Sequence, residues 1–184
     1  EDAQGKELWK PEIVRERVLT PEESWLMVDM MKDVIRRGSA ASGVAGTGFN
    51  LPAGGKTGTT NDYTDVWFIG YTADLVAGVW MGFDKPQKIM PNAQGGRLAA
   101  PAWARFMIEA YQRKPAPPDW PRPSSLVSRQ VDALTGLLAN PGCPARDAYT
   151  EWFIAGTEPI AECPPRAAAP SAPVPRATAP SRRP

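Results

Sequence analysis

The sequence predicts an α+β fold in which helices flank an antiparallel sheet. Three strand-like segments, about 51–59, 65–72 and 75–84, follow one another through turns at Asn61-Asp62 and Ala73-Asp74, and connections that short favour antiparallel pairing. The second and third segments carry apolar residues on both faces, which is typical of strands that are covered on both sides. Segments with helical spacing precede and follow the strands. We therefore expect a sheet with helices as its cover.

The first helix is expected to begin after residue 20. The run Thr20-Pro21-Glu22-Glu23 combines an N-cap, a proline at the first helical position and a capping-box glutamate. Apolar residues then recur at helical spacing: Trp25, Leu26, Val28, Met30, Met31, Val34 and Ile35. Asp29 is spaced to pair with Lys32, and Asp33 with Arg37. Gly38 predicts the end of the helix.

The segments around this helix and after the strands are less regular. Residues 1–18 suggest a short hairpin, and the Gly-, Ser- and Ala-rich residues 39–50 predict a loop. Apolar spacing predicts a second helix over about 98–112, in which Pro101 fits only the first turn. Trp67, Trp80 and Trp103 are expected to pack between the sheet and the helices.

A proline-rich segment divides the chain. Residues 1–113 hold the predicted sheet and helices, and 114–123, with five prolines, are expected to be an extended spacer. We expect 124–163 to form a small module with strand-like segments at 125–131 and 152–154, and a segment at 134–138. Residues 164–184 are Pro/Ala/Arg low complexity and are expected to be disordered.

Composition excludes some classes of protein and leaves others open. Of the 184 residues 42% are hydrophobic, enough for a core, and the net charge of +1 offers no electrostatic steering toward nucleic acid. The four arginines of the tail offset a formal −3 over residues 1–163. No apolar run approaches the roughly 20 residues of a membrane helix. The chain begins with Glu and resembles the C-terminal part of a longer protein, so an export signal or anchor is expected upstream.

Two cysteines, Cys143 and Cys163, stand 20 residues apart. They are either two unrelated thiols or, in an exported protein, a disulfide. The sequence contains no histidine, and two cysteines alone are a poor metal cage. We therefore expect no metal and no cofactor.

The chemistry suggested by the sequence centres on Lys56-Thr57-Gly58 and Thr59. Side chains alternate along a strand, so Lys56 and Gly58 share one face while Thr57 and Thr59 share the other. Two hydroxyls suit a carboxylate, and an ammonium favours anions and can hold a neighbouring group in the required protonation state. Gly58 lets another backbone or a substrate approach closely. With a backbone N–H as oxyanion donor, these parts suit acyl transfer.

The neighbours of this tripeptide resemble class A (bifunctional) penicillin-binding proteins. The resemblance lies in Gly-Lys-Thr-Gly-Thr-Thr-Asn-Asp-Tyr at 55–63, Asp-Val-Trp-Phe-Ile-Gly-Tyr-Thr at 65–72 and Val-Ala-Gly-Val-Trp-Met-Gly-Phe-Asp at 76–84. It covers about residues 1–113, and 124–163 is similar to C-terminal extensions of these enzymes. The resemblance implies the C-terminal part of a transpeptidase domain with the penicillin-binding protein/serine β-lactamase-like fold.

This resemblance implies roles for individual residues. Lys56 would orient and electrostatically support the nucleophilic serine and its partner serine. Thr57 and Thr59 would hydrogen-bond the terminal carboxylate of the donor peptide or the carboxylate of a β-lactam. The backbone N–H of Thr59 would form half of the oxyanion hole, with Gly58 permitting the approach. Apart from the resemblance, Tyr63 is expected to line the mouth of the cleft because it lies just past the motif.

The nucleophile of the family has no counterpart here. The family places it in Ser-x-x-Lys, with a partner in Ser-x-Asn, and no serine of this chain has Lys three residues on or Asn two residues on. We therefore expect the isolated chain to be inactive. The parent protein would cross-link peptidoglycan stem peptides through a serine acyl-enzyme at the extracytoplasmic face of the membrane. Its expected partners are stem peptides, β-lactam inhibitors and the missing N-terminal part of the same polypeptide, without nucleic acid.

Two alternatives remain open. One is a β-lactamase or D,D-carboxypeptidase relative, against which the long extension past residue 113 speaks. The other is a non-catalytic cell-wall-binding or sensor module that keeps the substrate-binding residues and has lost the catalytic activity.

Overall fold

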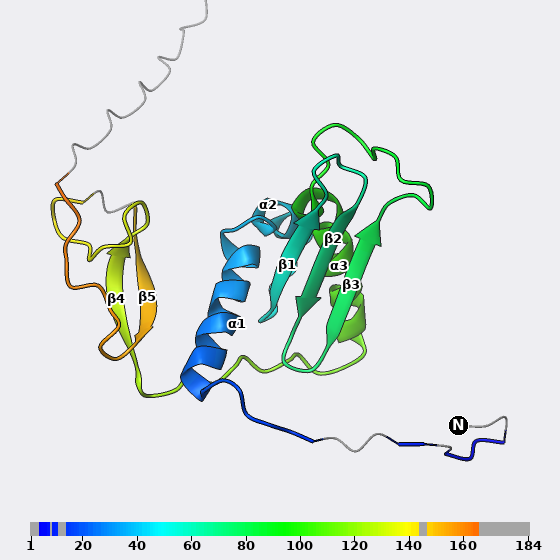
Figure 1. Cartoon of the computed structure of the whole chain (residues 1–184), viewed down its shortest axis with the longest axis horizontal. Helices are drawn as coiled ribbons and strands as arrows, with labels where there is room; N and C mark the ends of the chain where they lie inside the picture. The colour runs from blue at the N-terminus through cyan, green and yellow to red at the C-terminus, as the bar shows by residue number, and fades with distance from the viewer. Residues whose placement is uncertain (1–3, 8, 11–13, 144–146, 166–184) are drawn as a thin grey trace, which may run out of the picture. The chain divides into compact units, whose positions relative to one another are not determined.

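Three antiparallel strands form the centre of the larger of two units. The computed structural model describes residues 4–7, 9–10, 14–143 and 147–165, and the chain divides into compact units between Leu126 and Val127. In the first unit, β1 (Gly54–Thr59), β2 (Val66–Tyr71) and β3 (Val76–Met81) pair in the order β1-β2-β3 (Figure 1). Both pairs are antiparallel, as the sequence predicts.

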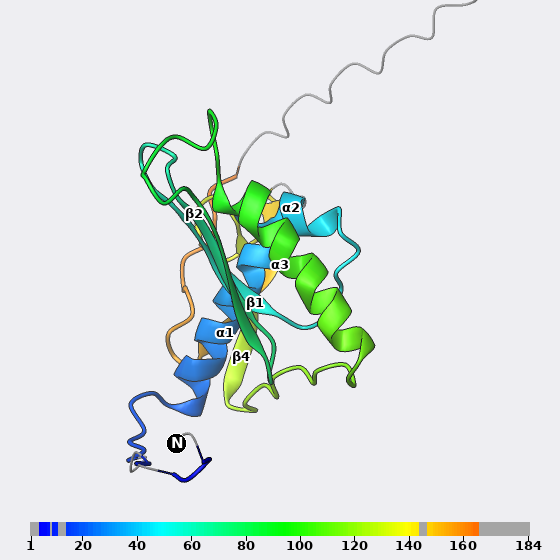
Figure 2. The ribbon, with the colours of Figure 1, turned by 90° about the vertical axis from the view of Figure 1, so that its right-hand side faces the viewer.

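One face of this sheet is covered by helix α3 (Gly95–Gln112), as the view along the sheet shows (Figure 2). Val66 and Phe68 of β2 point to this face and are fully buried, together with Trp103 and Met107 of α3. The indole Nε1 of Trp103 donates to the carbonyl of Gly70 at 3.1 Å. The expectation that Trp103 packs in the core is therefore confirmed.

The opposite face of the sheet differs from the prediction. The side chains of Trp67, Ile69 and Trp80 are 45%, 50% and 43% exposed, although apolar residues on both faces predicted cover on both sides. The alternation of the strands turns these residues away from α3, and on their face helix α1 lies against the start of β1, with Met31 beside Gly54, which leaves these three side chains half exposed. The rings of Trp67 and Trp80 instead contact each other, with centroids 6.3 Å apart. Their assignment to the core is wrong within the described part of the chain.

Helix α1 (Pro21–Arg36) begins with the predicted capping box. The backbone N–H of Glu23 donates to the Thr20 hydroxyl at 3.2 Å, and the Glu23 carboxylate accepts from the Thr20 N–H at 2.8 Å. Arg37, the C-cap residue, forms the predicted ion pair with Asp33. The predicted pairing of Lys32 with Asp29 is wrong, because the Lys32 ammonium is turned into the fold and bonds to Asp119, while Asp29 pairs with Arg36.

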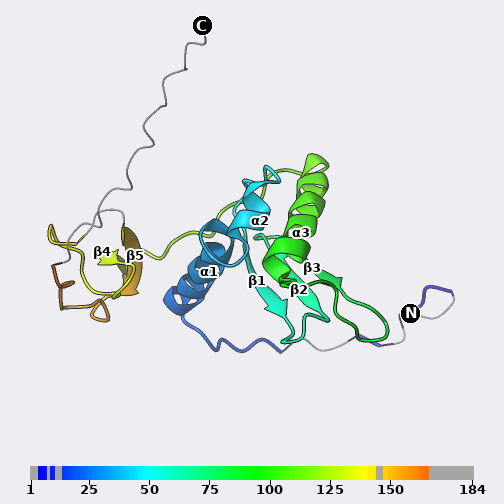
Figure 3. The same cartoon turned by 90° about the horizontal axis from the view of Figure 1, so that it is seen from above.

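The predicted loop 39–50 contains a short helix, α2 (Ala41–Ala45), which lies between α1 and α3 (Figure 3). Helix α3 begins at Gly95, three residues earlier than predicted, so Pro101 lies in its second turn. The glycines at the start of α3 let its first turn press against the chain just before α2, which periodicity along either segment does not reveal.

The remaining segments are simpler. The described residues among 4–18 contain no strand, so the predicted hairpin is not found there. Residues 114–123, the predicted spacer, contain no helix or strand. The predicted tail 164–184 lies outside the described residues from 166 on.

The second unit pairs β4 (Leu126–Asp132) with β5 (Ala148–Ile154). The segment at 134–138 contributes only single bridges, through Leu138 to Val131 and Glu162. Asp132 is fully buried, and its carboxylate accepts bonds from the backbone N–H and the hydroxyl of Thr135. Cys143 and Cys163 form a disulfide, with Cα atoms 6.4 Å apart.

Opening this disulfide should destabilise the second unit alone. It closes a loop between residues 20 apart, and replacing both cysteines by alanine is expected to cost about 3 kcal/mol through the freedom that the unfolded chain regains. Hydrogen exchange should then accelerate at amides of β4 and β5 and remain unchanged in α3. Equal acceleration in both units would contradict this independence.

A cluster at the β2–β3 turn should make the first unit sensitive to acid. Hydrogen bonds from Lys114 and then Tyr111 lower the pKa of Asp74 to about 2. A carboxylate whose pKa is depressed by folding contributes stability above its unfolded pKa of about 4, and loses it as the pH falls toward 2. The Tm of the wild type should therefore exceed that of Asp74→Asn at pH 6 and converge with it near pH 2. A Tm difference that stays constant over this range would rule the mechanism out.

Candidate functional site

The cleft that contains most of the predicted site residues lies beside the second half of β1, an edge strand of the sheet. Its volume is about 400 Å³. Four segments line it: the chain between α1 and α2, the strand β1, the β1–β2 turn and the start of α3. The lining residues are Ser39, Thr57, Thr59, Thr60, Asn61, Tyr63, Gln94, Gly95 and Gly96.

The two threonines of β1 are held by hydrogen bonds from opposite sides of the cleft. Thr57 pairs with Phe68 and Thr59 with Val66, so both threonines share the face of the sheet that α3 covers. The hydroxyls of Thr57 and Ser39 are 2.8 Å apart. The Thr59 hydroxyl accepts the backbone N–H of Gly95 at 3.1 Å. The Thr57 hydroxyl is therefore held by the chain just before α2, and the Thr59 hydroxyl by the first turn of α3.

The first turn of α3 approaches the site closely because it starts with two glycines. A Cβ on Gly95 would lie 2.2 Å from the carbonyl oxygen of Trp67 and 2.7 Å from that of Gly58. A Cβ on Gly96 would lie 1.9 Å from the carbonyl oxygen of Ser39. No side chain fits at these distances, so the width of the cleft depends on both glycines.

Lys56 and Gly58 point to the other face of β1. Lys56 pairs with Ile69, and Gly58 with Trp67, so their side is the exposed face of the sheet. Lys56 is itself exposed, and its Nζ donates to the carbonyl of Thr57 at 2.9 Å. The structure thus brings Thr57, Thr59 and Tyr63 together in one cleft, and places Lys56 and Gly58 on the opposite face of the same strand.

Tyr63 occupies the β1–β2 turn in a left-handed conformation, with φ of 62°. The Thr60 hydroxyl holds this turn by accepting the backbone N–H groups of Thr64 and Asp65, both at 3.0 Å. The ammonium of Lys88 lies 5.9 Å from the centre of the Tyr63 ring, within the range of a cation–π contact. The turn thereby sets Tyr63 at one side of the cleft.

Local hydrogen bonds favour the charged form of Asp62 in this turn. Bonds from its own backbone N–H, and then from Thr60 and Thr64, lower the pKa of Asp62. Asp62 is therefore ionised at neutral pH and acts in the turn, as its position in the sequence suggests.

Sequence reasoning missed Ser39 and the residues that open α3. Ser39 lies in a segment of small residues whose place in space depends on α1, and its distance from Thr57 in the chain is 18 residues. The pair Gly95-Gly96 just before an apolar helical run was a usable signal, because adjacent glycines at a helix start indicate a close backbone approach.

The chemistry available in the cleft is binding. Hydroxyls, backbone N–H groups and the end of an edge strand suit an extended ligand that carries a carboxylate. Ser39 hydrogen-bonds to the Thr57 hydroxyl, which is not a base at neutral pH, so Ser39 is not arranged as a nucleophile.

In the described ranges, no helix combines the length and the apolar character needed to cross a membrane.

Comparisons with known proteins agree on one family. The family model of the penicillin-binding protein transpeptidase domain matches residues 3–108. The model of the penicillin-binding protein 1A C-terminal domain matches residues 122–166.

Individual relatives give the same result. Penicillin-binding protein 1A of Pseudomonas aeruginosa is 41% identical over 138 residues, which cover 75% of this chain and 16% of that protein. Penicillin-binding protein 1A of Aquifex aeolicus is 30% identical over 148 residues, or 80% of this chain and 19% of that protein. The chain thus spans less than a fifth of the length of these relatives.

A solved structure is similar in fold. The crystal structure of penicillin-binding protein 1A from Haemophilus influenzae matches with a TM-score of 0.65 and 31% identity, over 80% of this chain and 22% of that chain. The predicted α+β fold, with its likeness to penicillin-binding proteins, is thereby confirmed.

Proposed function

Because the chain belongs to the penicillin-binding protein transpeptidase family, we propose that it forms the substrate-binding wall of a serine D,D-transpeptidase. The observation that carries the proposal is the pair of threonine hydroxyls, Thr57 and Thr59, held in one cleft at the end of an edge strand. The reaction cross-links peptidoglycan. A serine attacks the carbonyl between the two D-alanines of a stem peptide, releases the last D-alanine, and passes the acyl group to an amine of a second stem.

The two faces of the Lys-Thr-Gly strand have different roles in this reaction: one binds the substrate and the other supports the nucleophile. Thr57 and Thr59 hold the carboxylate of the donor peptide, or that of a β-lactam, on the cleft side. Lys56 supports the nucleophilic serine and its partner serine from the other face, where its ammonium bonds to the Thr57 carbonyl. The backbone N–H of Thr59 supplies half of the oxyanion hole, Gly58 permits the approach, and Tyr63 borders the donor peptide at the mouth.

The remaining half of the site comes from the rest of the same polypeptide. Its docking surface is the exposed face of the sheet, where Trp67, Ile69 and Trp80 are left half in solvent. Exposed apolar patches of this kind mark interaction surfaces. Lys56 projects from the same face, so the polypeptide that covers the tryptophans also brings the serine to Lys56. The site works outside the cytoplasmic membrane, where peptidoglycan is assembled.

One observation favours a second candidate, a cell-wall-binding module without catalysis. None of the eight serines of the chain has Lys three residues on, so the chain by itself has the substrate grip and not the nucleophile. Such a module would bind stem peptides through Thr57 and Thr59 and never form a covalent intermediate.

Labelling with a fluorescent penicillin separates the two candidates. The whole protein is expected to carry a covalent label that survives denaturation, and the chain of residues 1–184 is expected to carry none. Absence of label on the whole protein, together with binding of soluble stem peptides, would favour the binding module. Covalent label on the 184-residue chain would contradict the assignment of the nucleophile to another segment.

A further inference from the structure

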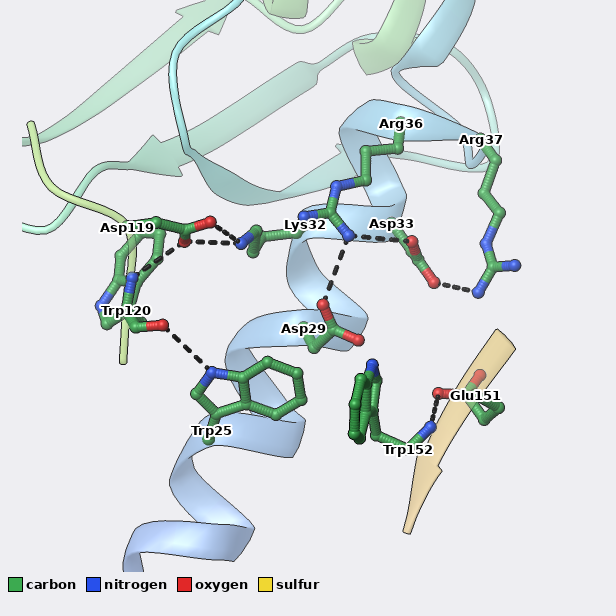
Figure 4. A network of polar contacts seen from close by, with 10 residues as sticks. All are labelled: Trp25, Asp29, Lys32, Asp33, Arg36, Arg37, Asp119, Trp120, Glu151 and Trp152. Carbon is green, nitrogen blue, oxygen red and sulfur yellow. Dashed lines mark hydrogen bonds and ion pairs between the residues drawn. The ribbon is translucent and has the colours of Figure 1, made fainter. Parts of the chain in front are cut away.

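A buried lysine on α1 depends on the proline-rich segment for its counterion. Lys32 is only 5% exposed, and its Nζ donates to both carboxylate oxygens of Asp119, at 2.6 and 2.8 Å (Figure 4). Burial raises the pKa of Asp119, but the bonds from Lys32 and from the Trp120 N–H outweigh it, so the pKa lies below its usual value. A buried ammonium that loses its partner is strongly unfavourable. Asp119 therefore has a defined place against α1.

The next residue, Trp120, ties α1 to the sheet. Its carbonyl accepts the indole N–H of Trp25 on α1 at 3.2 Å, and its ring meets that of Tyr71 on β2 edge to face, with centroids 5.7 Å apart. The backbone N–H of Trp120 donates to Asp119 at 2.8 Å, so the two residues hold each other. We call residues 119 and 120 the strap. It contacts both α1 and β2.

The strap contacts α1 and β2 at the points where they press on the start of β1. A Cβ on Gly54, the first residue of β1, would lie 3.1 Å from the Cβ of Met31 and 2.9 Å from the Tyr71 hydroxyl. Met31 precedes Lys32 in α1, and Tyr71 is the ring partner of Trp120. A shift of either element is therefore passed directly to Gly54, two residues before Lys56.

Helix α1 also sets the other side of the cleft. It ends at Arg36, and three residues later Ser39 meets the Thr57 hydroxyl at 2.8 Å. The backbone between them is tied to the end of the helix, since Gly38 donates to the Asp33 carbonyl at 2.7 Å and Ala40 to that of Val34 at 3.0 Å. The position of α1 thus determines both the start of β1 and the hydroxyl that orients Thr57.

We propose that Asp119 and Trp120 are positioning residues for the Lys-Thr-Gly strand, acting through α1 and Tyr71. The proline-rich segment is then part of the transpeptidase machinery and more than a connection to the second unit. Its prolines fix φ around the strap and lower the entropy lost when the strap docks. The effect of the strap on catalysis rests on the proposed function; its effect on the position of β1 does not.

Hydrogen exchange in the whole protein tests the effect on β1. Asp119→Asn should accelerate exchange of the β1 amides by about tenfold, because Lys32 is left buried without a full counterion. Amides of β3, which is separated from β1 by β2, should keep their rates. Asp84→Asn, which makes the same charge change at an exposed site, should leave β1 unchanged. Acceleration confined to residues 115–125, or equal in β1 and β3, would overturn the proposal.

A paired substitution separates ion pairing from packing. Lys32→Met combined with Asp119→Leu replaces both charged side chains by apolar ones of similar volume. Such replacements of buried ion pairs often leave the stability of a protein unchanged. The double variant should return β1 exchange to within about threefold of the wild type. Exchange as fast as in Asp119→Asn alone would show that the pair does not act through the buried charge, and would overturn this part of the proposal.

Acylation tests the effect on the reaction. In the whole protein, Asp119→Asn and Trp120→Ala should each lower the second-order rate of labelling by a fluorescent penicillin by about five- to tenfold, while the final labelled fraction stays the same. Faster β1 exchange with an unchanged labelling rate would reduce the strap to a structural role and overturn the positioning claim. A wild type that takes no label would instead contradict the proposed function, and the exchange experiment would still decide whether the strap holds β1.

Discussion

Replacing Gly96 by alanine is expected to destabilise the first unit by about 3 kcal/mol, a large share of the 5–15 kcal/mol that holds a typical domain. The added Cβ would lie 1.9 Å from the carbonyl oxygen of Ser39 and 2.8 Å from its carbonyl carbon. Both are backbone atoms, so no rotamer change relieves the clash, and α3 must move away from the chain before α2. Urea unfolding followed by far-UV circular dichroism measures the loss, because α1, α2 and α3 all belong to this unit.

Gly46→Ala is the matched control for this substitution. A Cβ on Gly46 meets nothing within 4 Å, and its φ of −71° suits any residue. Its stability should stay the same or rise by up to about 1 kcal/mol, because alanine restricts the unfolded chain. If Gly96→Ala were no more destabilising than Gly46→Ala, the close contact between α3 and Ser39 would be wrong, and with it the shape of the cleft.

Replacing Lys56 by alanine should abolish most of the activity while leaving the fold intact. Lys56 is exposed, and the contact of its ammonium is with the neighbouring carbonyl of Thr57, so the free energy of unfolding should change by about 0.5 kcal/mol or less. Under the proposed function its charge supports the nucleophilic serine, and loss of one such group costs about 10²–10³ in rate. The second-order rate of penicillin acylation in the whole protein measures the effect.

Lys85→Ala provides the control for charge. Lys85 is also exposed and lies outside the cleft lining, so its removal changes the net charge equally and should leave acylation within about twofold. Equal losses in both variants would mean that Lys56 acts through a general electrostatic effect. An acylation rate unchanged in Lys56→Ala would contradict its assigned role.

Local patterns predicted most of the first unit. The capping box at Thr20 and Glu23 uses residues three apart, and the strands after Lys56 are separated by short turns, so neighbours in the chain are neighbours in space. The two strands that follow the motif were predicted within two or three residues of their ends: Val66–Tyr71 and Val76–Met81. Such interactions can be inferred from spacing because the chain itself holds the partners together.

Contacts between distant segments were not predicted. The ion pair of Lys32 with Asp119 joins residues 87 apart, and a local rule assigned Lys32 to Asp29 instead. The start of α3 was placed too late because Gly95 and Gly96 have no apolar side chains and so do not contribute to the helical pattern. They matter because they let α3 approach the backbone of Trp67 and Ser39 closely. The exposure of Trp67 and Trp80 depends on which helices reach their face, and strand composition does not contain that information.

The sequence by itself determined the family, the Lys-Thr-Gly strand and the faces on which its side chains point, because alternation along a strand and short-range motifs are properties of consecutive residues. Only the tertiary structure decided that Ser39 and the first turn of α3 complete a cleft with Thr57 and Thr59. It also decided that the proline-rich segment reaches back to α1 through Asp119 and Trp120. Those arrangements depend on how the helices and the sheet pack. The buried charge of Lys32 requires a counterion, and Gly95 and Gly96 allow a close backbone approach, but neither property says which distant segment provides the contact.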